Sequence, residues 1–264
     1  MKIAIIGAGN LGLSIAKGII KSDLYKSLYI TKRNINTIKE LKTTDNIHLT
    51  IDNQEAIINS DVIIFATQPY QLEEILILNK KLFTNEKTII SVVLGYTTEN
   101  IEKIIGYQHP IIRAMPNTAI AVGQSMTCIC SNKSGVERMK LALNIFNSLG
   151  HTLEIAEKHM SAATVICGSG IAFWMRMIRA TTEGAVEMGI EADEALDMAI
   201  HSCLGAAKLL KTTKNNPEQE IDKVTTPGGC TITGLNEMEH HGLSSSIIKG
   251  LVTSFHKVNH ITDK

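Results

Sequence analysis

A glycine pattern near the start of the chain constrains its fold more than any other feature. Residues 7–12 read Gly-Ala-Gly-Asn-Leu-Gly, directly after the apolar run 3–6 and before a segment, 11–21, with helical spacing of apolar residues. The first glycine permits a tight turn, the second lets the backbone approach a pyrophosphate, and the third allows close packing of helix on strand. The pattern predicts a dinucleotide at the helix N-terminus, with a purely structural turn as the alternative. The predicted contacts are Gly7, Ala8, Gly9, Asn10, Leu11 and Gly12.

Short β-branched runs alternate with helical segments throughout residues 1–155. Strands separated by helices indicate right-handed βαβ units and a mostly parallel sheet. The expected strands are 2–7, 28–31, 47–51, 61–66, 88–93 and 110–114, with 125–131 and 151–155 closing the sheet edge. The expected helices are 11–21, 34–41, 53–59, 71–79 and 135–149.

The strand pattern stops after about residue 156. Segments 164–189, 192–211, 231–241 and 243–263 have apolar residues at three- and four-residue spacing, which is typical of helices. The sequence therefore predicts an α/β fold, with a dinucleotide-binding domain at 1–155 followed by an all-α domain at 156–264. We expect the helical domain to dimerise, and the alternative is a self-contained bundle.

The end of the second expected strand indicates which dinucleotide is bound. NAD enzymes usually place an acidic residue there, about 20 residues after the glycines, to hold the ribose 2′-hydroxyl. No acidic residue occurs from Leu24 to Lys39, whereas Thr31, Lys32 and Arg33 offer hydrogen-bond donors and positive charge. A 2′-phosphate would be attracted by these groups, so the sequence favours NADP over NAD. A solvated basic turn is the alternative.

Other strand ends are expected to line the same crevice, because ligands of parallel sheets bind at the carboxyl ends of the strands. Asn53 opens a predicted helix and is either its N-cap or a cofactor contact. The remaining candidates follow the fourth and fifth expected strands, and they are Ala66, Thr67, Gln68, Pro69 and Val92.

A second candidate site lies at Pro227-Gly228-Gly229, ahead of a helix expected from about Thr231. Proline and two glycines stop a preceding helix and permit backbone conformations closed to other residues. Free amides at the following helix start suit a carboxylate, so we expect an anion site. The alternative is a simple connector between helices.

Composition excludes several classes of protein. Acidic and basic residues balance at 26 each, so no global charge favours nucleic acid or anionic lipid. No run of about 18 uninterrupted apolar residues occurs, so no membrane span is expected. Five cysteines without a Cys-x-x-Cys pair, and histidines without metal spacing, indicate a reduced cytoplasmic protein without a bound metal. Cys128 and Cys130 are interpreted as one face of a strand.

Several blocks together resemble the pyrroline-5-carboxylate reductase family over essentially the whole chain. Besides residues 6–12, they are Ala66-Thr67-Gln68-Pro69, Arg113-Ala114-Met115-Pro116-Asn117-Thr118, Gly168-Ser169-Gly170, Leu204-Gly205-Ala206-Ala207-Lys208 and Pro227-Gly228-Gly229-Cys230-Thr231-Ile232. The resemblance implies a Rossmann domain and a helical domain that interlocks two subunits, with larger oligomers built from dimers.

The resemblance also implies roles for particular residues. It puts the substrate carboxylate near Gly229 and Cys230, with the hydroxyl of Thr231 close to the ring nitrogen. Glu157 matches a family glutamate near the substrate. The nicotinamide side of the pocket is implied for Met115, Pro116 and Asn117. Departures from the family pattern occur at Gln68, Ile171 and Phe173, and they bear on substrate tolerance.

The expected activity is NADPH-dependent reduction of Δ1-pyrroline-5-carboxylate to L-proline. A protonated cyclic imine is already electrophilic, so positioning should dominate, with Thr231 orienting the iminium nitrogen or relaying its proton. One alternative is a related reductase acting on another imine or on a ketoacid. Against the ketoacid class, the helix after Gly170 carries Arg176 and Arg179 but no lysine until Lys208. The other alternative is a sensor that binds NADP without turnover.

Overall fold

The computed structural model describes residues 1–262, which form two compact units. The first unit comprises residues 1–171 together with the segment from Phe255 onward, and the second comprises residues 172–254.

The first unit is built on an eight-stranded sheet of order β3-β2-β1-β4-β5-β6-β7-β8. Its strands are β1 (Lys2–Ile6), β2 (Ser27–Thr31), β3 (Ile47–Thr50), β4 (Val62–Phe65), β5 (Thr88–Ser91), β6 (Ile111–Met115), β7 (Ser125–Ser131) and β8 (Gly150–Glu154). All neighbouring strands are parallel except β6 and β7. The mostly parallel sheet predicted from the sequence is confirmed, with β8 at its edge.

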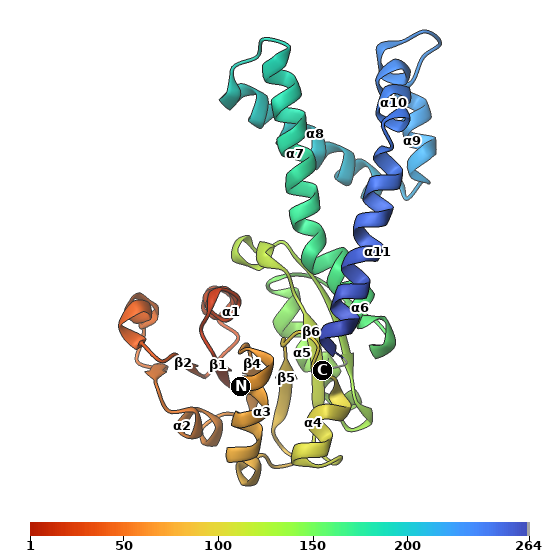
Figure 1. Cartoon of the computed structure of the whole chain (residues 1–264). Coiled ribbons are helices and arrows are strands. Elements are labelled where there is room, and N and C mark those ends of the chain that lie inside the picture. The colour runs from red at the N-terminus through yellow and green to blue at the C-terminus, as the bar shows by residue number, and fades with distance from the viewer. Residues whose placement is uncertain (263–264) are drawn as a thin grey trace. The chain divides into compact units, whose positions relative to one another are not determined.

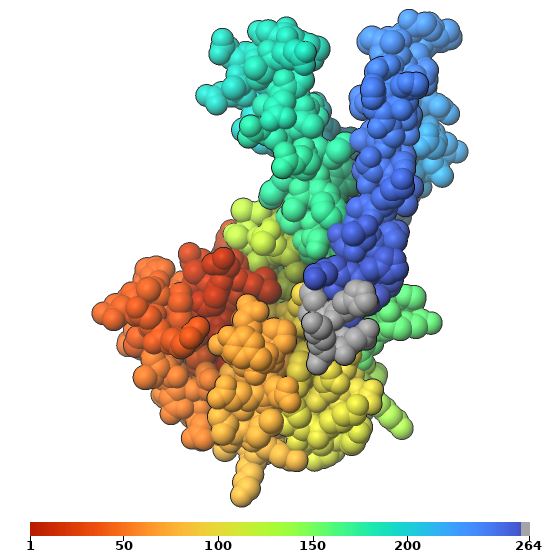
Figure 2. Space-filling model, in the orientation of Figure 1, coloured from red at the N-terminus to blue at the C-terminus, as the bar shows by residue number. Residues whose placement is uncertain are grey.

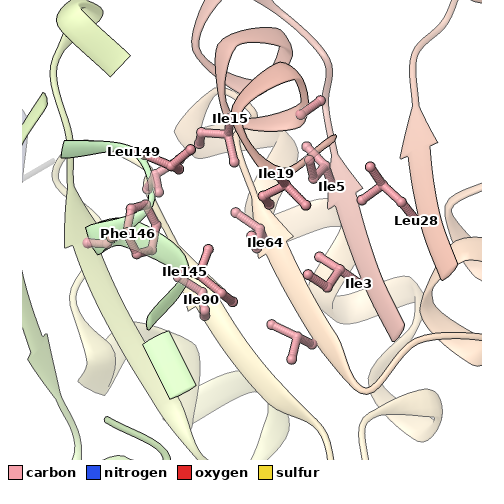
Figure 3. Packing of buried hydrophobic residues seen from close by; sticks show 14 of the residues in the cluster. Ile3, Ile5, Ile15, Ile19, Leu28, Ile64, Ile90, Ile145, Phe146 and Leu149 are labelled. Carbon is pink, nitrogen blue, oxygen red and sulfur yellow. The ribbon is translucent and has the colours of Figure 1, made fainter. Parts of the chain in front are cut away.

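Helices cover both faces of this sheet (Figure 1). Helices α1 (Asn10–Ser22) and α5 (Met139–Asn147) pack on one face, and α2 (Asn53–Ile58), α3 (Pro69–Leu78) and α4 (Thr98–Ile105) pack on the other. Strand side chains alternate between the faces: Ile3 and Ile5 belong to the first core cluster, whereas Ala4 and Ile6 belong to the second. Figure 3 shows Ile15 and Ile19 of α1 above the strands. Because the strands are buried on both faces, the positions of their carboxyl ends are well defined.

Three segments of the first unit differ from the sequence expectation, and one is the start of the helix expected at 135–149, where residues up to Arg138 are 3-10 and α5 begins only at Met139. The segment 34–41 was expected to be α-helical, but it forms a 3-10 stretch, η1 (Ile35–Leu41), with non-helical angles at Ile38. Its β-branched residues crowd the preceding turn, and seven residues are too few to offset the cost of helix nucleation. Helix α4 was not predicted, because its eight residues give only about two turns of helical spacing. The other short 3-10 stretches are η2 (Lys80–Leu82), η3 (Thr118–Val122), η4 (Lys133–Arg138) and η5 (Glu157–His159).

The second half of the described chain is helical, as predicted. Continuous helical structure runs from Glu157 through α6 (Met160–Ala163), a π-helical turn η6 (Thr164–Ser169) and α7 (Gly170–Glu187). The remaining helices are α8 (Ala192–Thr213), α9 (Pro217–Val224), α10 (Cys230–His240) and α11 (Leu243–Thr262). Helix α9 was not predicted, and it begins with a capping box at Asn216 and a proline at its first position.

The helices of the second unit expose many apolar side chains. Figure 2 shows the helices of this unit, coloured green to blue, as two columns of atoms. Trp174 is 64% exposed, and Met188 and Leu204 are also exposed. The run Glu157–Glu187 is long and apolar enough to cross a membrane by length and composition alone, although polar residues interrupt it and no such span was expected from the sequence. A monomer rarely leaves so much apolar surface in contact with water.

Candidate active site

The turn between β1 and α1 has the geometry that the glycine pattern predicted. Gly7 has a φ of +96°, and a Cβ there would lie 2.7 Å from Thr67 Cγ2. A side chain at Gly12 would collide with the carbonyl oxygen of Gly7. At Gly9, by contrast, a Cβ would meet no atom within 4 Å, so one side of the turn is open. The first turn of α1 has no acidic residue and no side-chain cap, which leaves its amides available to an anion.

Thr31, at the end of β2, holds this turn in place. The amide of Gly7 donates a hydrogen bond to Thr31 Oγ1 at 3.1 Å, and the amide of Ala8 donates to the Thr31 carbonyl at 2.9 Å. Thr31 is only 3% exposed. The structure therefore gives Thr31 a supporting role in the glycine turn, while its predicted contact with a 2′-phosphate stays a prediction.

A groove of about 810 Å³ runs along the carboxyl ends of β1, β2, β3 and β4. Ten of the predicted cofactor residues line it, and they are Gly7, Ala8, Gly9, Thr31, Lys32, Arg33, Asn53, Ala66, Thr67 and Gln68. Eight lie outside its lining, and they are Asn10, Leu11, Gly12, Pro69, Val92, Met115, Pro116 and Asn117. The dinucleotide-sized space is therefore centred on the glycine turn and the basic end of β2.

Further lining residues were not predicted from the sequence, and they include Asn34, Asp52, Gln54, Gln71 and Glu74. Asp52 and Gln54 follow β3, so the same argument about strand ends could have found them. Asp52 caps α2 by accepting a hydrogen bond from the amide of Gln54 at 2.8 Å. Because its carboxylate is engaged with α2, Asp52 does not replace the ribose-binding acid that is missing from the end of β2.

Asn53 is the first residue of α2, but Asp52 and not Asn53 is its N-cap. The side chain of Asn53 therefore does not cap α2, and Asn53 lines the groove. This observation favours the cofactor-contact interpretation of the two that the sequence left open.

Asn117 is anchored at three points in the segment after β6. Its amide donates to Ser125 Oγ at 3.1 Å, its Nδ2 donates to the carbonyl of Cys167 at 2.9 Å, and its Oδ1 accepts from the amide of Ala119 at 3.0 Å. Met115 and Pro116, directly before it, are buried. These three residues form a rigid segment that is held against the π-helical turn.

Glu157 is the centre of a polar cluster beside this segment. Its Oε1 accepts hydrogen bonds from the amide of Thr98 and from Arg113, each at 2.8 Å, and its Oε2 accepts from Thr98 Oγ1 at 2.5 Å. Burial alone would raise the pKa of this carboxyl, but the bonds from Thr98 and Arg113 outweigh it and lower the pKa. The cluster joins β6, the start of α4 and the start of the long helical run.

The arginine of this cluster is almost completely enclosed. The side chain of Arg113 is 6% exposed and that of Glu157 is 29% exposed. The Nε of Arg113 has no hydrogen-bond partner among the described residues. A buried cation of this kind depends on its carboxylate partner, so Glu157 has a structural role whatever it does for a substrate.

In the second unit, the Pro-Gly-Gly segment forms the expected turn. Gly228 has a φ of +68°, and Gly229 is the N-cap of α10 without any side-chain cap. The Gly229 carbonyl accepts a hydrogen bond from Thr233 Oγ1 at 3.1 Å. The amides of the first turn of α10 are thus left for an external anion, with Thr231 half-buried among them and Cys230 exposed.

Comparison with known proteins identifies the family. Residues 2–95 match a family described as "NADP oxidoreductase coenzyme F420-dependent", and residues 157–261 match one described as "Pyrroline-5-carboxylate reductase dimerisation". Pyrroline-5-carboxylate reductase 2 of Dictyostelium discoideum is 43% identical over 272 residues, which cover 97% of this chain and 91% of that protein. The chain belongs to the pyrroline-5-carboxylate reductase family. Pyrroline-5-carboxylate reductase 1 of the same organism is also 43% identical, and the chain spans 49% of its length.

Solved structures agree with this membership in the family. The pyrroline carboxylate reductase of Plasmodium falciparum, solved with NADP bound, superposes with a TM-score of 0.89 at 25% identity, covering 99% of this chain and 98% of that one. The pyrroline-5-carboxylate reductase of Coxiella burnetii also gives 0.89, at 28% identity and the same coverage. The two-part α/β and helical architecture is therefore that of the family.

Proposed function

We propose that this chain reduces Δ1-pyrroline-5-carboxylate to L-proline with NADPH. The observation that carries the proposal is a pair of anion-receptive helix starts in a chain of this family. One is the glycine turn before α1, with its adjoining groove, and the other is Gly228-Gly229 before α10. A dinucleotide pyrophosphate suits the first, and the carboxylate of a small amino-acid-like substrate suits the second.

The groove suits NADP in its local chemistry. Gly9 leaves open the side of the turn where a pyrophosphate would approach, and Lys32 and Arg33 line the groove at the end of β2. Bound there, the nicotinamide supplies the hydride. We infer a preference for NADPH over NADH, because the two cations would pair with a 2′-phosphate that NADH lacks.

The residues of the chain bind and orient. The amides of Cys230 and Thr231 would hold the substrate carboxylate beside Gly229, whose own amide donates to the Thr226 carbonyl at 2.9 Å. The hydroxyl of Thr231 would donate to or accept from the ring nitrogen. The segment Met115-Pro116-Asn117, fixed by its three hydrogen bonds, would form a wall beside the nicotinamide. Since the imine is protonated before it accepts the hydride, orientation accounts for most of the rate.

For the assembly, we propose residues 1–155 as the NADP-binding domain and 156–264 as the helical substrate and dimerisation domain. The exposed apolar side chains of α7 and α8 support a homodimer or a larger oligomer of dimers, since a second copy would cover them. An interface of this kind also accounts for the apolar run Glu157–Glu187 without a membrane. We therefore expect a cytoplasmic enzyme whose substrate is a small molecule.

The test is oxidation of NADPH, followed by the loss of its absorbance with Δ1-pyrroline-5-carboxylate as substrate. We expect turnover with this imine, slower turnover with its six-membered homologue, and a higher KM for NADH than for NADPH. The double variant Lys32→Ala/Arg33→Ala should raise the KM for NADPH and leave that for NADH nearly unchanged. Cofactor binding without turnover on any imine would instead indicate a sensor.

A further inference from the structure

Two cysteine sulfur atoms that the proposed reaction does not use lie side by side in the first unit. Cys128 Sγ in β7 lies 3.8 Å from Cys167 Sγ in the π-helical turn η6. Cys128 is buried, whereas Cys167 is partly exposed. Both pack in a small cluster with Met115 and Met160. The pair therefore combines one reachable sulfur with one enclosed sulfur in direct contact with it.

The two thiols differ in their acidity. The hydrogen bond with Cys128 lowers the pKa of Cys167, and the same bond together with burial raises the pKa of Cys128. The thiolate is the form of cysteine that reacts with oxidants. Cys167 is thus the thiol that ionises first, and Cys128 is positioned to react with whatever forms on it.

We propose that Cys128 and Cys167 form a reversible disulfide when the protein meets hydrogen peroxide. The Cys167 thiolate attacks one peroxide oxygen, the O–O bond breaks, and the departing hydroxide takes a proton to become water. The sulfur of Cys128 then attacks the resulting sulfenic acid of Cys167, the S–O bond breaks, and the hydroxide leaves with the thiol proton as a second water. Two thiols and one peroxide thus give one disulfide and two waters, with two electrons passing from sulfur to oxygen.

The disulfide would also act on the proposed site. Because a disulfide is about 2 Å long, the two sulfur atoms must approach each other by nearly 2 Å. The carbonyl of Cys167 accepts the hydrogen bond from Asn117 Nδ2, so a shift of the π-helical turn pulls on the segment Met115–Asn117. Turns with π-helical bonding often lie at functional sites and interrupt the regular helical ladder. If the proposed function holds, oxidation should slow turnover about tenfold or more, since misplacement by 1 Å can cost on the order of 100-fold.

The disulfide itself is tested by mass spectrometry, independently of any activity. Trypsin places Cys128 and Cys130 in one peptide, 114–133, and Cys167 in another, 159–176. After brief treatment with hydrogen peroxide and blocking of free thiols, we expect these two peptides joined, with a mass lower by two hydrogens, and separated again by dithiothreitol. Absence of the joined peptide from the oxidised wild-type protein would overturn the proposal, and this outcome does not depend on how any variant folds.

Matched variants identify which cysteine of the first peptide is involved. Cys130→Ser should retain the joined peptide, because burial raises the pKa of Cys130 to about 12 and its sulfur has no cysteine partner among the described residues. Cys128→Ala should abolish the joined peptide and leave NADPH oxidation insensitive to peroxide. A joined peptide that persists in Cys128→Ala would assign the bond to Cys130 and refute the pair. Joined peptides without any loss of turnover would refute only the coupling to Asn117, and no turnover in either redox state would count against the proposed function alone.

Discussion

Thr231 is the side chain in the second unit on which the proposed chemistry depends most. Its hydroxyl makes no hydrogen bond within the described part of the chain, whereas that of Thr233 is engaged by the Gly229 carbonyl. Thr231→Val keeps the shape but removes the hydroxyl, and should lower kcat by about 10–1000-fold. Thr231→Ser should restore most of the rate, which steady-state assays would measure. Equal kcat values for Thr231→Val and the wild-type enzyme would contradict this role.

Glu157 should contribute to stability in a pH-dependent way. Its lowered pKa means that its contribution is complete above the pKa of an unfolded glutamate and is lost as the pH falls through the lower folded value. Glu157→Gln should therefore lower the free energy of unfolding by about 2 kcal/mol at pH 7. The difference in unfolding free energy between Glu157→Gln and the wild-type protein should become smaller as the pH falls below about 4. Urea titrations at each pH would measure it.

Glu99 provides the control for this measurement, because it follows Thr98 in the first turn of α4 but pairs with Lys103 at the surface instead of with the buried cluster. Glu99→Gln should change stability by less than about 0.5 kcal/mol. A deficit in Glu157→Gln that is the same at pH 4 and pH 7 would show that the charged cluster is not its source.

At the scale of elements, we expect two glycines of the turn between β1 and α1 to have different roles: Gly7 is needed for the fold, and Gly9 for the cofactor. Gly7→Ala would put a side chain at a φ of +96° and against Thr67, so we expect a loss of stability of about 1–3 kcal/mol. Gly9→Ala meets no atom of the chain and should melt like the wild-type protein while raising the KM for NADPH. Thermal melts and steady-state assays on both variants measure the difference. A wild-type KM in Gly9→Ala would argue against a pyrophosphate at this turn.

The sequence predicted the strands and the long helices, and it missed two short helices. All eight strands were expected. Those at the centre of the sheet are β-branched runs buried on both faces, which leave a continuous apolar signal, whereas the edge strand β8 is mostly exposed and mixes polar with apolar residues. Helices α4 and α9 were missed because each has only eight residues, so their apolar side chains cover little more than two turns. The 3-10 stretch η1 had helical spacing, and only local backbone preference decided against an α-helix.

The parts of the candidate site that are formed by consecutive residues could be predicted from the sequence. The glycine turn, the basic end of β2 and the Pro-Gly-Gly turn are each read from a few neighbours in the sequence. The partnership of Glu157 with Thr98 and Arg113 joins residues 59 and 44 positions apart, and no local pattern indicates it. The contact between Cys128 and Cys167 spans 39 positions and was likewise invisible.

For the whole molecule, the exposed apolar helices predict self-association. Trp174 of α7 is 64% exposed and sits in the region that matches the family's dimerisation domain. Trp174→Glu should weaken the oligomer, which light scattering during gel filtration would measure against a subunit mass of 28.8 kDa. Tyr107→Glu, at a residue 62% exposed in the first unit, is the matched control and should leave the oligomer unchanged. A wild-type protein that runs as a 28.8 kDa monomer would contradict the assembly proposed here.

The central claim is that the hydride of NADPH passes to the imine carbon of Δ1-pyrroline-5-carboxylate on this chain. The most direct measurement supplies NADPH stereospecifically deuterated at each face of nicotinamide carbon 4 in turn, and analyses the product by mass spectrometry and deuterium NMR. The account predicts proline carrying one deuterium, bound to ring carbon 5, from one of the two labelled cofactors. If neither labelled cofactor gives deuterated proline, or if no proline forms at all, the account is contradicted.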